Sequence, residues 1–192
     1  MTLYGADDAA PPATLLSVYS PVNGRRTNLV VARLSATGQL LLRNDSTGAR
    51  DVAVDVLGWW APSSVPGGSL YKVLKTAGAI DTTSGLGIVG EMTAGRTATA
   101  TLAGVGGVPS TTAATVTAVA LQATVIGPEA NTALVAWPGG GTKPAIRDAS
   151  PRMGSDHTIL VVAPLANGTA SFQNTTGTVD LRAYAVGYWY QP

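Results

Sequence analysis

Two aspartates in the segment DVAVDVLGWW, Asp51 and Asp55, are the first candidates for a carboxylate pair that could hydrolyse a glycoside. Glycoside hydrolysis needs one acidic group on each side of the sugar, with the two about 5–10 Å apart. Asp51 and Asp55 are four residues apart, so on a strand they would point to the same face about 13 Å from each other. That separation is too long for either mechanism, and the pair predicts structural acids instead.

His157 is the only residue of the chain that could act as a general base near neutral pH, because there is one histidine and no cysteine. The neighbouring Asp156 could orient its imidazole, although the same pair also suits a turn at the beginning of a strand. A zinc site needs three or four nitrogen, sulfur or oxygen ligands, which this composition does not supply. We therefore predict a non-enzymatic protein with no catalytic residue.

Other acidic and glycine-rich segments are candidates for calcium or phosphate binding. Asp7-Asp8, or Asp148 together with Asp156, could contribute to a calcium site, but the chain has no Asp-x-Asp-x-Asp-Gly loop. The segment PGGGTKP (138–144) lacks the glycine spacing of a phosphate-binding loop and is typical of a turn. We predict neither a metal site nor a cofactor.

The composition is apolar and weakly charged. Charged residues make up 12% of the chain, about half the usual share, while 45% are hydrophobic and the net charge is +1. This charge gives no basic surface for nucleic acid, and we interpret Arg25-Arg26 as a solvated loop. No apolar run approaches the roughly 18 residues of a membrane span, so we expect no membrane insertion.

Alternation of apolar and polar residues dominates the chain, and this period of two predicts strands. Glycine-containing turn sequences such as SATGQ, NDSTGA and LANGT separate the alternating segments. No segment shows ten residues of helical periodicity, so we predict an all-β protein. The predicted strands are 27–34, 39–44, 51–60, 97–102, 115–126, 132–137, 157–165, 169–174 and 180–190.

The chain also contains an internal repeat, in which residues 1–62 match residues 133–192. The offset falls from 131 at Leu29/Leu160 to 129 at Trp60/Trp189, through two single-residue gaps that lie in turns. About 70 residues between the copies have no counterpart, so the chain is half a repeat followed by a whole one. The matched pairs include Leu29/Leu160, Val30/Val161, Leu34/Leu165, Asn44/Asn174, Asp51/Asp180, Gly58/Gly187 and Trp60/Trp189.

The order of motifs in the whole copy resembles a known repeat. DTTSGLG, GGVP, AVALQATVIGP, TALVAWPGG and a final VGYW follow one another as in the roughly 130-residue β-repeats of actinobacterial secreted and cell-surface proteins. Those repeats read DTR where this chain has Thr83 in third place, and LNVT where it has Gln122. The resemblance implies a non-catalytic module of the kind that accompanies hydrolases, and it is compatible with a protein of an actinobacteriophage particle.

These patterns predict a jelly-roll-like β-sandwich built from two homologous antiparallel sheet units. We expect a half-repeat β unit (1–62), a linker (63–70) and a full-repeat sandwich (71–192) that packs with 1–62 as one body. Four or five strands close poorly on their own, so the half copy should pack against the whole copy or another subunit. A propeller-like radial arrangement is the alternative.

Aromatic residues gather at the two matching strand ends, which makes them the candidate ligand or interface residues. Neighbours on a strand point to opposite faces, so each copy should send one ring inward and one outward. The outward ring suits a protein interface, where Trp and Tyr are enriched, or a sugar platform. The candidates are Trp59, Trp60, Tyr188, Trp189 and Tyr190.

We therefore expect a structural or assembly module of an actinobacterial cell surface or phage particle, with protein partners or self-assembly. The alternative is a carbohydrate-binding, lectin-like module that recognises a cell-surface glycan. Both place the protein outside the cell or in a virion. The opening sequence MTLYGADDAAPP shows no signal-peptide pattern, which leaves release by lysis, a dedicated machine or a longer secreted parent.

Overall fold

A computed structural model describes residues 1–9, 27–62, 64–112 and 114–191. Within these ranges the chain forms nine β-strands and no helix, and it divides into two compact units, Met1–Asp55 and Val56–Pro192. The prediction of an all-β protein is confirmed. None of the described residues forms a helix long and apolar enough to cross a membrane.

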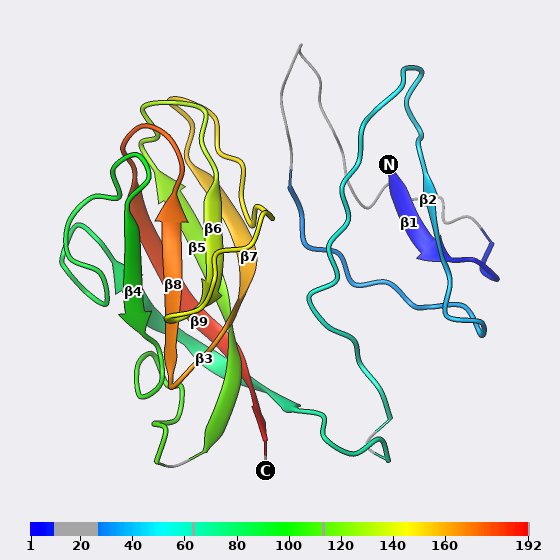
Figure 1. The fold of residues 1–192 in the computed structure, drawn as a ribbon, viewed down its shortest axis with the longest axis horizontal. Helices are drawn as coiled ribbons and strands as arrows, with labels where there is room; N and C mark the ends of the chain where they lie inside the picture. Colours follow the sequence, from blue (N-terminus) through cyan, green and yellow to red (C-terminus); the bar gives the residue numbers. More distant parts are fainter. Residues whose placement is uncertain (10–26, 63, 113, 192) are drawn as a thin grey trace. The chain divides into compact units, whose positions relative to one another are not determined.

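The second unit contains two antiparallel sheets that lie one over the other (Figure 1). A four-stranded sheet has the order β3-β9-β5-β7, and a three-stranded sheet has the order β4-β8-β6. Its strands are β3 (Leu70–Asp81), β4 (Thr97–Thr101), β5 (Thr115–Ile126), β6 (Leu134–Pro138), β7 (His157–Pro164), β8 (Thr169–Asn174) and β9 (Asp180–Gln191). This arrangement is a β-sandwich rather than a propeller, and the whole copy supplies both of its sheets.

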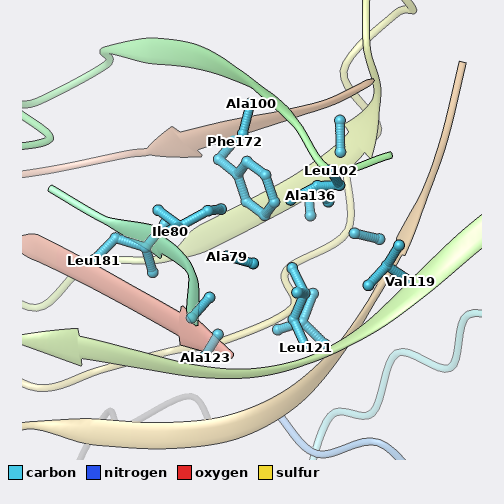
Figure 2. Packing of buried hydrophobic residues seen from close by; sticks show 14 of the residues in the cluster. Ala79, Ile80, Ala100, Leu102, Val119, Leu121, Ala123, Ala136, Phe172 and Leu181 are labelled. Atoms are coloured by element: carbon cyan, nitrogen blue, oxygen red, sulfur yellow. The ribbon is translucent and has the colours of Figure 1, made fainter. Parts of the chain in front are cut away.

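The core lies between the two sheets, where alternate residues of facing strands meet (Figure 2). On β5 the inward positions Val119 and Leu121 are buried, while Gln122 between the buried residues is exposed. Phe172 of β8 reaches the same cluster from the three-stranded sheet and is only 1% exposed. Burial of alternate side chains from both sheets is the packing that holds a sandwich together.

Among the described residues of the first unit, the strands are β1 (Thr2–Gly5) and β2 (Leu40–Arg43), which pair antiparallel. The predicted strands 27–34 and 51–60 were wrong, because both segments lack strand structure. Their repeat counterparts, β7 and β9, both pair with β5, and residues 1–62 contain no counterpart of β5. An extended segment without a neighbour leaves its backbone groups unpaired, so sequence pattern alone does not make a strand.

β3 begins at Leu70, at the end of the predicted linker, and the alternation pattern did not identify it. Its pairing with β9 shifts register between Val73 and Ala77 and again between Gly78 and Ile80. The first shift sets four residue steps of β3 against two of β9, and the second sets two against one. The period-two signal is therefore lost within β3, although its 12 residues form a continuous strand.

The half copy forms the same strand pair as the end of the whole copy. With the offset of 130 that joins Asn44 to Asn174, β2 falls on residues 170–173 of β8. β1 lies antiparallel to β2, and β6 lies antiparallel to β8. The preceding turn is also alike, since Gly38 and Gly168 both have left-handed backbone angles, with φ of 77° and 76°.

The asparagine that follows this strand pair closes the same turn in both copies. Asn174 donates from Nδ2 to the carbonyl oxygen of Gly177 over 2.8 Å, and Asn44 donates to that of Gly48 over 2.9 Å. Gly48 and Gly177 are matched by the repeat. The half copy therefore reproduces the local structure of β6–β8 and lacks the pairings that depend on β3, β4 and β5.

Candidate binding surface

Tyr71 and Trp189 form an aromatic pair at one end of the four-stranded sheet. They lie opposite each other on β3 and β9, with ring centroids 4.6 Å apart and ring planes at 46°. Tyr188, the neighbour of Trp189, is buried in the core, so Trp189 points to the outer face. Tyr71 is exposed on the same face, and the pair presents apolar ring surface to solvent.

Gly187 makes room for this pair. A Cβ atom added at Gly187 would overlap the ring of Tyr71, which lies across the glycine from the neighbouring strand. Aromatic rings that cover a glycine on an adjacent strand pin the strand register. The close approach of Tyr71 therefore explains why this position of the whole copy is a glycine.

Replacing Gly187 with valine should destabilise the sandwich by about 1–3 kcal/mol, because Tyr71 must move and break its contact with Trp189. Urea unfolding followed by circular dichroism measures the loss. The double variant with Tyr71→Ala removes the obstructing ring, so part of the stability should return. An equal loss with and without Tyr71 would contradict this steric explanation.

The other two C-terminal candidates face the core. Tyr188 is buried, and Tyr190 packs against the core cluster. Their ring centroids are 5.6 Å apart, a distance at which aromatic rings attract each other. Of the three aromatic candidates on β9, Trp189 is therefore the one that lies on the outer face.

Trp59 and Trp60, the candidates in the half copy, are both exposed, at 79% and 65%. They follow a segment whose valines are also exposed, including Val54 at 60% and Val56 at 81%. The structure thus shows a run of apolar side chains in 51–60 that no described residue covers. Asp51 and Asp55 lie in this segment, which lacks the strand structure on which their predicted same-face spacing depends.

Asp81 at the end of β3 holds two elements together. Its carboxylate accepts hydrogen bonds from the hydroxyl of Thr83 over 2.6 Å and from Nε of Arg182 over 3.0 Å. These bonds, first that of Thr83 and then that of Arg182, hold the pKa of Asp81 below its usual value. Thr83 thus has a structural role here.

Protonation of Asp81 should weaken the sandwich in acid. Because its pKa is lower folded than unfolded, its stabilising effect is present above the ordinary value of about 3.9 and is lost as the pH falls through the folded pKa. Asp81→Asn should therefore be less stable than the native chain at pH 6, and the difference should shrink toward pH 2. Urea midpoints across this range test it, and a constant difference would contradict it.

Asp180, the repeat counterpart of Asp51, is a structural acid. Its carboxylate accepts a hydrogen bond from the hydroxyl of Thr82 over 2.7 Å. The same hydroxyl accepts one from the backbone N–H of Leu181 over 3.0 Å. The residue thus ties the start of β9 to the turn after β3, and the interpretation of Asp51/Asp180 as a structural pair holds for Asp180.

The other polar candidates are separated by the fold. Asp156 accepts a hydrogen bond from the backbone of Gly127, Asp148 from that of Ala136, and Asp7 and Asp8 pair with Arg33. His157 begins β7. Among the described residues no three acidic or histidine side chains gather where they could hold a metal. Arg25 and Arg26 lie outside the described residues.

Comparison with protein-family models, curated proteins and solved structures gave no match. Function must therefore be inferred from the geometry of the chain itself. The sequence had indicated the aromatic strand ends through their repetition, but it missed Tyr71 because β3 was not recognised. The retained Gly58/Gly187 pair was the available signal, since a glycine kept beside an aromatic on a strand indicates a close approach by another group.

Proposed function

We propose that this protein is a non-catalytic structural module that assembles with other proteins on an actinobacterial cell surface or in an actinobacteriophage particle. The order of repeat motifs supports the location. The exposed apolar run in 51–60 supports the assembly role and is the observation on which the proposal depends.

Clustered exposed apolar side chains are uncommon on soluble monomers and mark protein contacts. In this segment the exposed apolar residues are Val52, Val54, Val56, Leu57, Trp59 and Trp60. Tryptophan is among the residues that contribute most to binding energy at protein interfaces. Covering this segment with a protein partner would remove two exposed tryptophans and their apolar neighbours from water.

The full chain should associate with itself or with partner proteins through these residues. Size-exclusion chromatography with light scattering should show a mass that rises with concentration. The variant Trp59→Ser/Trp60→Ser should shift this rise to at least about tenfold higher concentration, because interface tryptophans often contribute 2 kcal/mol or more. Trp189→Ser, on the outer face of the four-stranded sheet, is the matched control. A strict monomer at high concentration that also recruits no co-expressed surface or virion protein would overturn the proposal.

A carbohydrate-binding role is the second candidate, and the outward pair of Tyr71 and Trp189 favours it. Exposed aromatic rings on a sheet face offer a platform on which a sugar can stack. A glycan array with Trp60→Ala and Trp189→Ala controls tests this role. Binding that Trp189→Ala abolishes would support it, and absence of binding to any wall or capsule glycan would exclude it.

A further inference from the structure

The half copy has apolar residues at positions that face the core in the whole copy. It lacks the strands that bury those positions there. On β9 the positions Leu181, Ala183 and Ala185 point inward and are completely buried. Their repeat counterparts, at the offset of 129, are Val52, Val54 and Val56, which are all exposed. Tyr188, likewise buried, corresponds to the exposed Trp59. Positions that form the core in one copy are thus equally apolar but uncovered in the other.

The whole copy shows which strand covers these positions when the repeat is complete. β5 lies between β7 and β9 and pairs with both, in antiparallel register from Ala118 to Val125 with β7 and from Thr115 to Ile126 with β9. Segments 27–34 and 51–60 correspond to β7 and β9. Among the described residues neither segment pairs with a strand, and the sequence of 1–62 contains no counterpart of β3, β4 or β5.

Two further residues of the half copy match contacts made by this missing block. The ring of Tyr71 on β3 lies where a side chain at Gly187 would be. At its counterpart Gly58 no heavy atom lies within 4 Å of an added Cβ. Asp180 accepts a hydrogen bond from Thr82, at the end of β3, and its counterpart is Asp51. The half copy therefore retains a space for an aromatic ring and an acceptor for a hydroxyl.

We propose that residues 27–62 bind a block of three strands of the β3–β4–β5 type that a different polypeptide donates, with its β5-like strand inserted between 27–34 and 51–60. This inference deepens the proposed assembly function and rests on it. The donor carries an apolar strand alternating like β5, an aromatic at the position of Tyr71 and a hydroxyl at that of Thr82. Strand addition of this kind gains main-chain hydrogen bonds as well as apolar burial.

A second copy of this chain cannot supply the missing block of three strands. Each copy carries one block, residues 70–126, and two segments that can accept it, 1–62 and 133–191. The structure pairs the block with 133–191. Each added copy brings one block and two acceptor segments, so one acceptor segment per chain remains without a block. The donor is therefore a polypeptide that has such a block without its own acceptor.

The experiment uses the full chain and, as the probe, a polypeptide of residues 66–131 diluted into it from urea. A 1:1 complex in size-exclusion with light scattering is expected. Amide exchange within 27–34 and 51–60 should slow by at least about tenfold, and tryptophan emission should shift to shorter wavelength. No complex, or slowed exchange confined to 70–191, would overturn the proposal. Protection of 51–60 in the free chain, with 180–190 unprotected, would also overturn it, because the chain's own block would then occupy the site.

Gly58→Val supplies the decisive control. The added side chain meets no atom in the free chain, so unfolding without the probe should be unchanged. It would collide with Tyr71 of the probe, so affinity for the probe should fall by at least about tenfold, as 1.4 kcal/mol or more of steric cost requires. A probe with Tyr71→Ala should restore binding to this variant. Self-association is measured without the probe, so its result tests the assembly function independently of the donor.

Discussion

Phe172→Ala should lower the free energy of unfolding of the sandwich by about 3–5 kcal/mol, the largest loss expected from a single substitution in this chain. The ring is 1% exposed and lies between the two sheets (Figure 2). Its removal both returns apolar burial to water and leaves a cavity in a packed interior. Urea unfolding followed by circular dichroism measures the change.

The repeat provides a matched control for this prediction. Leu42 is the counterpart of Phe172 in the half copy, and it is exposed on β2. Leu42→Ala should therefore change stability by no more than about 0.5 kcal/mol. Equal effects of the two substitutions would contradict a core located between the sheets of the whole copy alone.

Asn174→Ala should cost about 2–4 kcal/mol, because it leaves several buried groups without hydrogen bonds. The amide of Asn174 donates to the carbonyl oxygens of Met92 and Gly177, each over 2.8 Å. Its Oδ1 accepts a hydrogen bond from the hydroxyl of Thr132 over 2.5 Å. One side chain thus joins the segment before β4, the turn before β9 and the segment before β6.

Asn44→Ala is the corresponding control, because Asn44 closes the same local turn but is exposed to solvent. Water replaces the lost hydrogen bonds there, so the expected loss is below about 1 kcal/mol. Chemical unfolding of both variants gives the comparison. A loss for Asn44→Ala as large as that for Asn174→Ala would show that the turn, rather than the buried network, determines the cost.

Sequence alternation predicted the strands of the whole copy closely where both faces of a strand have distinct environments. The predicted 115–126 coincides with β5, and 180–190 ends one residue before β9. It failed at β3, whose bulges break the alternation, and at 51–60, whose alternation is present without a partner strand. Alternation in the sequence indicates which face of a segment is apolar. Whether the segment forms a strand also depends on the neighbouring strands available to pair with it.

The candidate site could be predicted only in part, for a related reason. Repetition indicated Trp60 and Trp189, and alternation placed neighbouring rings on opposite faces. Which ring faces outward depended on the buried position of Tyr188, and the contact with Tyr71 depended on the β3–β9 register. Contacts between distant segments follow from topology, which one sequence does not specify.

The bulges of β3 also affect how the sheet meets other molecules. β3 is an edge strand of the four-stranded sheet, and its outer backbone could serve as a template for a further strand. Two register shifts interrupt that edge, and the exposed Lys72 and Lys75 add charge to it. Bulges and lysines are devices by which natural sheets resist edge-to-edge aggregation. The four-stranded sheet is thus protected at this edge against open-ended growth by strand addition.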